Sequence, residues 1–472
     1  MRYFLTLALA LSASAASAQT LELADVLAST QTHHPQIEAA LQSEEAAREQ
    51  LLASRGGFDP YLSVYGSLRH GGYYELRGID AEIRQATPYW GAEVYAGYRY
   101  HEGVDQDRFP TYYSTETLNG GEVRAGLRVP ILRGGPMDSR RARVARSEFS
   151  LEGAENARQL TLLEVERSAL TAYFSWVASG RRLQVAEQLR ELARTRQEWV
   201  NARVEAGAIA PIEALEAQRS VLRRESSYIS ARRDLEAKAL TLALFARDDS
   251  GAPEPPAAEQ LPEALPMPEA IPNDASEHSR AIVACHPSLQ RVRADVESSR
   301  VSVRLADANR LPRLDAQVQV SRDFGDLTGE TFENGADDTL GGTVLEGSLV
   351  FTVPLLNRSG RGGAEAASRT LSAKLESLRL AEDRLAMRVL DTLSAYRAAA
   401  ENHDIVANLV TNTVELAEAE RRRFEAGGTS LFIVNQREQA LAEAAVSEVN
   451  AVRALWSARA SWNALIACTE AP

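Results

Sequence analysis

Apolar and polar residues alternate with a period of two in several short stretches of the chain. After Tyr61, apolar Leu62 and Val64 alternate with polar residues, and the same alternation occurs in residues 122–129, 314–321 and 345–352. This period is typical of strands that have one apolar and one polar face. The sequence therefore predicts strands in two parts of the chain, at about 61–130 and at about 313–354.

Residues 92–100 also alternate, through Ala92, Val94, Ala96, Tyr98 and Tyr100. They give the first strand region a third strand-like run, and an odd crossing would reverse the direction of the chain. We interpret this run as part of a hairpin in a loop that projects outward from the predicted sheet.

Long helical stretches follow each strand region. No proline occurs in residues 137–210 or 355–471, and a helix of 70 residues spans about 100 Å. Helices of that length pack along partners as a coiled coil or a helical tube. Each stretch contains a Glu-Ala-Gly segment, which predicts the tight turn of a helical hairpin near Gly207 and again near Gly427.

The chain contains two copies of one unit, because four landmarks occur twice in the same order. Pro312 follows Pro60 by 252 positions, whereas Pro354 follows Pro130 by only 224, so the first copy has 28 extra residues between these landmarks. We place the strand-like run at 92–100 in this insertion. The four landmarks are His34-Pro35 and His286-Pro287, Pro60 and Pro312, Val129-Pro130 and Val353-Pro354, and the Glu-Ala-Gly segments at 205–207 and 425–427.

One segment of distinct composition precedes the first copy, and another lies between the two copies. Residues 1–18 combine a positive start, a short apolar run and an Ala-Ser-Ala cleavage signal, which predicts a secretory signal peptide. We place the first copy at 19–250, a proline-rich linker at 251–280 and the second copy at 281–472. No later stretch has about 18 continuous apolar residues, so no transmembrane helix is expected.

Charge and motif content exclude several classes of function. The net charge of -13 argues against general nucleic-acid binding. The seven histidines form no zinc-binding helix motif, and neither a nucleophile elbow nor a phosphate-binding loop occurs. We therefore expect no enzyme, no catalytic residue, no metal site and no cofactor. Cys285 and Cys468 are the only cysteines; in an oxidising periplasm they form either one disulfide or two unpaired core thiols.

The expected strands suit a membrane wall assembled from several chains. Two strands per copy give about four per chain, which is too few to close a barrel, whereas three chains give twelve. The apolar face would meet lipid and the polar face would line a lumen. Ten of the fourteen tyrosines lie between Tyr61 and Tyr113, as expected at a membrane interface. Ordinary strand preference is the alternative.

The doubled His-Pro starts, the Pro-Ile-Leu and Pro-Leu-Leu corners and the paired Ala-Gly turns resemble the outer-membrane efflux protein family, the TolC-like channel-tunnels. The resemblance implies an α+β membrane protein with two structural repeats per chain. It implies a trimeric, twelve-stranded outer-membrane β-barrel continued by a long periplasmic α-helical barrel. A periplasmic coiled-coil adaptor is the rival interpretation, but it does not account for the paired strands.

The resemblance also implies a function and a set of partners. The chain would be the outer-membrane channel of a tripartite efflux or type I secretion system in a Gram-negative bacterium, reaching into the periplasm. It would be a passive exit duct for small molecules or polypeptides. Its partners would be two further copies, outer-membrane lipid, a periplasmic adaptor protein and an inner-membrane pump of the RND, ABC or a similar class.

Family resemblance further assigns roles to the hairpin turns, where the adaptor is expected to dock. The alternative is that small residues are present only because the turns need positive φ. Family members often carry acidic residues six and nine positions after each turn glycine, forming a charged gate. The first copy has Glu213 and Glu216, whereas the second has Ile433 and Gln436, and a solvated helix face is the alternative for the two acids. The docking candidates are Ala206, Gly207, Ala208, Ala426, Gly427, Gly428 and Thr429.

Overall fold

The computed structural model describes residues 20–70, 75–104, 117–271, 275–325 and 342–468. The predicted signal peptide at 1–18 lies outside these residues. The chain divides into two compact units. The first contains Met1–Leu41, Arg158–Pro287 and Asp383–Pro472, and the second contains Gln42–Ala157 and Ser288–Glu382.

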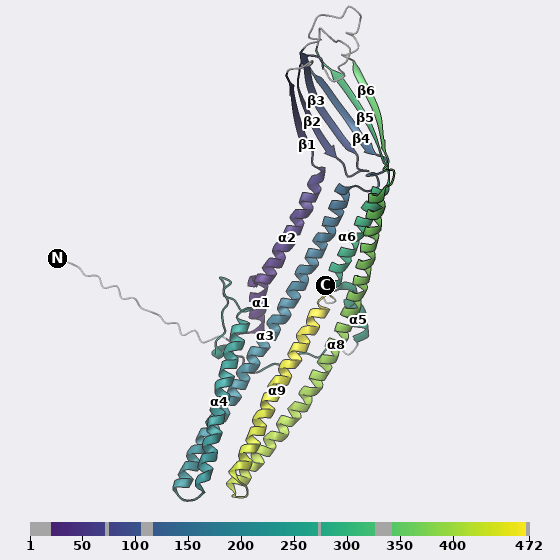
Figure 1. Ribbon diagram of the computed structural model, residues 1–472. Coiled ribbons are helices and arrows are strands. Elements are labelled where there is room, and N and C mark those ends of the chain that lie inside the picture. The colour runs from purple at the N-terminus through teal and green to yellow at the C-terminus, as the bar shows by residue number, and fades with distance from the viewer. Residues whose placement is uncertain (1–19, 71–74, 105–116, 272–274, 326–341, 469–472) are drawn as a thin grey trace, which may run out of the picture. The chain divides into compact units, whose positions relative to one another are not determined.

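A single antiparallel sheet forms the strand part of the second unit (Figure 1). Its strands follow one another in chain order, so every strand pairs with its neighbours in sequence. The four strands predicted from alternation are confirmed as β1, β4, β5 and β6. The strands are β1 (Tyr61–Arg69), β2 (Glu75–Ala86), β3 (Glu93–Val104), β4 (Glu122–Pro130), β5 (Arg313–Asp323) and β6 (Thr343–Thr352).

The expectation of two strands per copy is wrong for the first copy, which contributes four. Residues 92–100 do not project as part of a loop hairpin, because β3 pairs with β2 on one side and with β4 on the other. β2 escaped prediction because its polar face carries Asp80, Glu82 and Arg84, and charged residues are uncommon in strands. The expected twelve strands rested on four strands per chain, so that count loses its basis.

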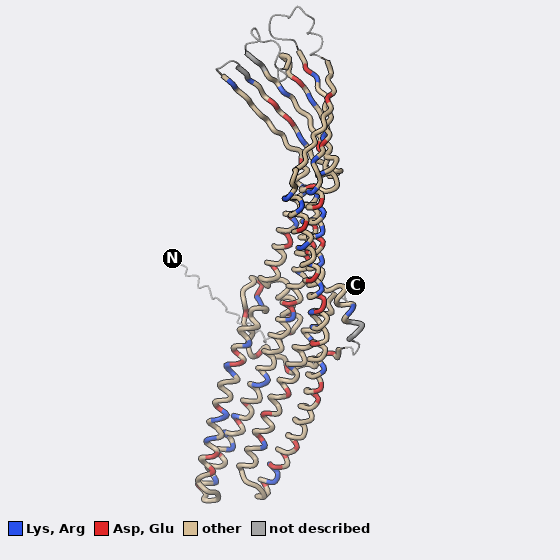
Figure 2. Tube along the Cα trace, turned by 45° about the vertical axis from the view of Figure 1, so that its right-hand side comes forward, with Lys and Arg blue, Asp and Glu red and all other residues tan. Residues whose placement is uncertain are grey.

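The register gives the sheet one apolar and one polar face across all its strands. One row of cross-strand neighbours runs from Leu62 on β1 to Leu345 on β6, through Ile83, Ala96, Ala125 and Val320. Leu62 is 64% exposed and Leu345 is 75% exposed. The opposite face carries arginines and carboxylates, which Figure 2 shows along the strands. Apolar side chains are thus left uncovered on one whole face of this chain's sheet.

Long helices follow the sheet strands in both copies, as predicted (Figure 1). The Asp138 carboxylate accepts the backbone N–H groups of Arg140 and Arg141 at 2.7 and 3.1 Å, which satisfies the first turn of α3. Among the described residues, no helix combines the length and apolar character needed to cross a membrane. The four long helices are α3 (Ser139–Glu205), α4 (Pro211–Leu242), α8 (Arg358–Glu425) and α9 (Leu431–Ile466).

Shorter helices begin each copy at the repeated His-Pro landmarks. Proline is favoured at the first helical position because its missing N–H has no partner there. Pro35 opens α2 and Pro287 opens α6, as the repeat predicts, and the preceding His34 and His286 are both buried. The shorter elements are α1 (Leu23–His33), α2 (Pro35–Arg55), α5 (Ala275–Cys285), α6 (Pro287–Arg310) and the 3₁₀ turns η1 (Gly56–Phe58) and η2 (Ala258–Gln260).

The proline-rich segment after residue 250 is held against the helices of the first unit by hydrogen bonds. The indole N–H of Trp456 donates to the Pro266 carbonyl at 2.6 Å, and the Tyr396 hydroxyl donates to the Glu269 carbonyl at 3.3 Å. The Trp456 ring also stacks on Phe174, with ring centroids 3.9 Å apart. Prolines cannot donate backbone hydrogen bonds, and in both of these hydrogen bonds the segment supplies a carbonyl oxygen.

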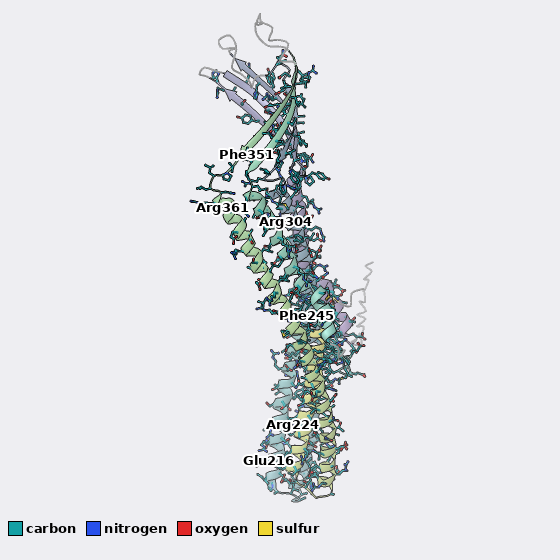
Figure 3. The ribbon with its side chains drawn as sticks, turned by 90° about the vertical axis from the view of Figure 1, so that its right-hand side faces the viewer. Glu216, Arg224, Phe245, Arg304, Phe351 and Arg361 are labelled. Atoms are coloured by element: carbon teal, nitrogen blue, oxygen red, sulfur yellow. A yellow bond between two sulfur atoms is a disulfide. The ribbon has the colours of Figure 1, made fainter. Side chains whose placement is uncertain are left out.

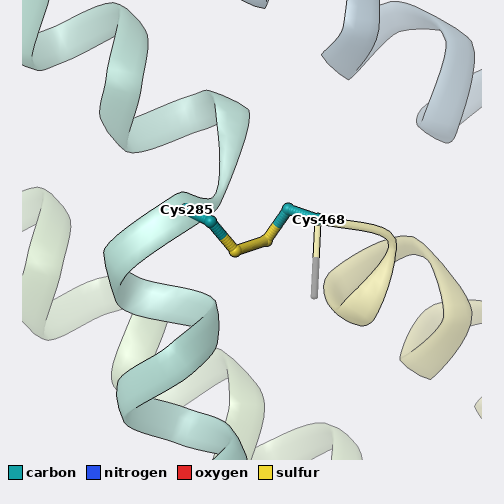
Figure 4. Close-up of a disulfide and its surroundings, with 2 residues drawn as sticks. All are labelled: Cys285 and Cys468. Atoms are coloured by element: carbon teal, nitrogen blue, oxygen red, sulfur yellow. A yellow bond between two sulfur atoms is a disulfide. The ribbon is translucent and has the colours of Figure 1, made fainter. Parts of the chain in front are cut away.

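A disulfide joins Cys285, the last residue of α5, to Cys468, just beyond α9 (Figure 4). The sequence left two alternatives for these cysteines, and the structure shows the paired one. Their Cα atoms lie 5.8 Å apart, although 183 positions separate them in the chain. The bond therefore links the start of the second copy to its last long helix.

Candidate functional site

The two hairpin turns of the first unit have the same backbone geometry. Gly207 and Gly427 have φ of +68° and +75°, which glycine adopts without steric cost. Ala208 donates its N–H to the Arg203 carbonyl at 2.8 Å, and Gly428 donates to Arg423 at 2.8 Å. These bonds close a Schellman motif at the end of each first helix. The predicted turns near 207 and 427 are confirmed.

The turn residues are accessible in this chain. Residues 206–208 and 426–428 are exposed, and Thr429 is half-buried. A Cβ atom added at Gly207 or Gly427 would meet no other atom within 4 Å. The turn surface therefore has room for another protein to approach the backbone, although the positive φ alone is sufficient to explain the glycines.

An apolar cluster lies beside the turns and joins the two hairpins. Leu431, the first residue of α9, is 6% exposed and packs with Val200 of α3 and Ala217 of α4. Phe424 of α8 packs against the same group. Because Val200 and Leu431 come from different copies, burial of this cluster ties the tip of one hairpin to the tip of the other.

A buried ion pair makes a second connection between the hairpins. Arg196 of α3 donates from both Nη atoms to the two carboxylate oxygens of Glu438 on α9, each at 2.6 Å. Arg421 of α8 donates to the same carboxylate at 3.3 Å, and Arg196 also donates to Asn435 at 2.8 Å. Glu438 is only 5% exposed. A bidentate pair of this kind fixes the orientation of both side chains.

The charges around Glu438 keep it ionised despite its burial. Burial by itself raises the pKa of Glu438, but the hydrogen bonds and positive charges of Arg196 and Arg421 outweigh it and leave the pKa below its ordinary value. Burial lowers the pKa of Arg224 on α4, which the negative charge of Glu438 partly offsets. The site thus concentrates cations around one buried carboxylate.

The candidate gate residues lie on the surface of α4 and α9. Glu216 forms an ion pair with Arg219 of the same helix at 2.7 Å, and both side chains are substantially exposed. Glu213 is half-buried, and Gln436 on α9 is exposed. Figure 3 shows Glu216 closer than Arg224 to the hairpin turn. Within one chain these residues form no ring of carboxylates, and Glu216 has the surroundings of a solvated helix face.

Sequence reasoning missed Glu438 and its arginine partners, although a signal for them exists. Leu431, Val434, Glu438 and Ala442 follow one another at three- or four-residue spacing, and all four are buried. An acidic residue within such an apolar stripe indicates a buried ion pair, because an unpaired buried charge is costly. The partner could not be named from the sequence, since Arg196 lies 242 positions away.

The hairpin tips combine contacts between the two copies with exposed turn residues. In the portions of the chain that the structure covers, no three His, Cys, Asp or Glu side chains converge on a possible metal site. The features that stand out are two turns of equal geometry, an apolar cluster and an ion pair that spans the two copies. These contacts hold the two hairpins to each other near their turns.

Comparison with known proteins gives one family and one fold. The family model described as outer membrane efflux protein matches residues 26–246 and 280–467. No curated protein sequence matches the chain.

Solved structures of outer-membrane channels share the fold at low identity. The outer-membrane channel OprN is 15% identical with a TM-score of 0.67, and 94% of this chain aligns with 90% of it. The CmeC channel of Campylobacter jejuni is 14% identical with a TM-score of 0.63, over 94% of this chain and 85% of that one. The open state of the Neisseria gonorrhoeae MtrE channel is 14% identical with a TM-score of 0.65, over 94% and 88%.

Proposed function

Because the chain belongs to the outer membrane efflux protein family, we propose that three copies of it form one passive exit channel of a tripartite efflux system. The chain is an outer-membrane channel component that extends into the periplasm. An inner-membrane pump of the RND, ABC or a similar class supplies the energy, and a periplasmic adaptor connects the two. The match across both copies of the repeat is the observation that carries this proposal.

The open sheet supports assembly with further copies. In the described part of the chain, β1 and β6 each pair with a strand on one side only. Open sheet edges expose unpaired backbone groups, which are too costly to leave in lipid. The exposed apolar face suits outer-membrane lipid, and closure of the wall requires other chains to cover the two edges.

The hairpin turns support adaptor docking. Ala206, Gly207 and Ala208, together with residues 426–429, present the same backbone geometry twice per chain. Six such turns in a trimer would offer an adaptor repeated contacts of small residues, where backbones can approach closely. Docking there would act on hairpins that the Arg196–Glu438 pair and the Leu431 cluster hold together.

Glu213 and Glu216 are the candidates for an acidic gate in this assembly. Three copies would bring six carboxylates to one constriction, and a carboxylate ring favours cations and attracts polyvalent blockers. Gln436 would contribute a neutral position from the second copy. Single-channel recordings with a trivalent cation test the idea, because E213Q together with E216Q should abolish the block. A block of equal strength in that variant would place the two acids outside the constriction.

The mass of the native particle extracted from outer membranes in mild detergent tests the assembly. We expect a mass close to three chains and migration on gels that changes on heating. A monomer released from membranes without detergent would contradict the channel proposal, because its strands would then lie outside lipid.

A further inference from the structure

The first copy carries a strand hairpin that the second copy lacks. β5 and β6 are direct neighbours, whereas β1 and β4, at the corresponding landmarks, are separated by β2 and β3. The β2–β3 hairpin occupies Glu75–Val104, close to the 28 residues by which the copies differ. Thr87 donates its N–H to the Ala92 carbonyl at 2.8 Å and closes the turn between the two strands.

Backbone pairing makes this hairpin part of the sheet. β2 pairs along the whole of β1, from Tyr61 opposite Arg84 to Arg69 opposite Leu76. β3 pairs with β4 from Glu93 opposite Arg128 to Arg99 opposite Glu122. The hairpin is therefore bonded on both sides and does not hang from the edge of the sheet.

Side chains on the polar face connect the hairpin to strands beyond its direct neighbours. The Tyr95 hydroxyl on β3 donates to Gln319 at 2.8 Å and accepts from Gln317 at 2.7 Å, so it reaches β5 across β4. Gly126 leaves the necessary space, because a Cβ atom there would lie 2.3 Å from the Tyr95 ring. Arg124 on β4 donates to Asp80 on β2 at 2.9 Å, across β3. Bonds that span three strands fix the hairpin in the plane of the sheet.

The apolar face continues through the hairpin without interruption. Ile79, Ile83, Val94 and Tyr98 are exposed on the same face as the apolar residues of β1 and β4. A hairpin that left the wall and stood in water would have no reason to keep an apolar face in register with the membrane face. The shared pattern indicates that β2 and β3 meet the same surroundings as the other strands.

The two edge strands, β1 and β6, run in the directions needed for β1 of one chain to pair with β6 of another. The six strands alternate in direction, so β1 and β6 run antiparallel. Nearly every residue of β1 and every residue of β6 is exposed in the single chain. An even number of antiparallel strands per chain allows closure by repetition of the same contact.

We propose that β1 of one copy pairs with β6 of the next, so that three chains form an eighteen-stranded wall, six strands from each. This inference rests on the trimer of the proposed function. Barrel diameter grows roughly linearly with strand number, so the exit is about 1.5 times as wide as a twelve-stranded one. Barrels of sixteen to eighteen strands enclose an aqueous channel, and this one is lined by fixed ion pairs. The exit therefore suits bulky, water-soluble cargo.

Electron cryomicroscopy of the full-length particle in lipid nanodiscs tests the strand number directly. The expected image has three chains and eighteen strands, and β2 and β3 of each chain are among the strands of the wall. Three chains around a twelve-stranded wall, with the hairpin outside it, would overturn this inference and leave the proposed function standing. A particle without three chains would overturn the proposed trimer itself.

Disulfide trapping tests the contact between chains in a second way. S63C or S67C on β1 is combined with S348C on β6, because all three serines lie on the polar face. Oxidation should convert one of these pairs into covalently linked trimers on gels. The matched control combines S67C with S321C on β5, one strand in from the edge, and should stay monomeric. Equal yields in both would overturn the β1–β6 contact.

Discussion

Arg124 and Glu82 lie 2.9 Å apart as an ion pair, although a whole strand runs between them. The register places Gly97 of β3 directly between the two residues. Because glycine has no side chain, the Arg124 guanidinium can cross β3 and reach the acids of β2. A missing side chain thus allows three strands to be joined on the polar face.

Replacing Gly97 by valine should weaken the sheet. A Cβ atom at Gly97 would lie 2.8 Å from the Ala81 carbonyl oxygen and 3.1 Å from Glu82 Cβ. Overpacking of this kind costs about 1–3 kcal/mol, and the Arg124–Glu82 pair would be lost as well. The temperature at which the native particle dissociates on gels should fall. G66V is the control, because a Cβ at Gly66 meets nothing within 4 Å; equal losses in both variants would contradict the explanation.

Replacing Glu438 by alanine should loosen the two hairpins from each other. The change leaves Arg196 and Arg421 without their carboxylate, and loss of a hydrogen bond to a charged group costs roughly 1.5–3 kcal/mol. Hydrogen exchange should become faster in α9 near Leu431 and in the facing part of α3. E216A removes only an exposed pair with Arg219 and should change stability by less than about 1 kcal/mol. Unchanged exchange in E438A would show that the pair does not hold the tip.

Replacing Gly427 by tryptophan should abolish export and leave the trimer intact. The space around Gly427 is open within the chain, so the bulky side chain would meet no other part of its own chain and would obstruct a docked partner. The positive φ adds strain of about 1–2 kcal/mol. G427N separates the two effects, because asparagine tolerates this φ and is small, and it should retain export. Loss of the trimer in G427W would count against docking at this turn.

Acidification should destabilise the first unit as the pH falls below about 6.5. Burial and the positive charge of Arg247 lower the pKa of His34 below the ordinary 6.5. Burial and the positive charge of Arg388 lower the pKa of His286 in the same way. Below pH 6.5 the two histidines therefore bind more protons in the unfolded chain than in the folded one. The free energy of unfolding falls as the pH drops from 6.5 towards the folded pKa. The lowered pKa of Glu438 adds a further loss only below its ordinary 4.5.

Thermal unfolding of the extracted particle, followed by near-ultraviolet circular dichroism from pH 7.5 to 5.0, measures this dependence. The unfolding temperature should fall as the pH drops below about 6.5. The double variant H34N/H286N should lose most of the dependence while keeping a polar side chain before each proline. If the unfolding temperature of the double variant depends on pH as strongly as that of the unchanged protein, groups other than His34 and His286 are responsible.

The long hairpins are predictable from sequence because proline-free stretches and Glu-Ala-Gly turns are local signals. Alternation marks five of the strands for the same reason, and β3 is among them. The place of β3 inside the sheet is not predictable from this local signal. β2 itself is not predictable, because its stability depends on ion pairs with other strands. From the local sequence alone, Asp80 is typical of a loop. In the folded chain it lies in a strand, where Arg124 of β4 donates a hydrogen bond to it.

Some residues of the candidate site are likewise predictable from the local sequence, and others depend on how distant helices pack. Gly207 and Gly427 are predictable because a helical turn needs positive φ at one residue. Glu438 could have been suspected from its place in an apolar stripe, but its partner depends on how α3 and α9 pack. The pairing of Cys285 with Cys468 likewise follows from tertiary contact and not from spacing.

The Cys285–Cys468 bond also sets an order of events during biosynthesis. The two thiols are 183 positions apart, so α6, β5, β6, α8 and α9 must all be delivered to an oxidising compartment before the bond can form. Once it forms, it closes these elements into a covalent ring. A protease that cuts one peptide bond inside the ring leaves the fragments attached. Integrity of the second copy after such a cut therefore reports on oxidation, independently of how well its helices pack.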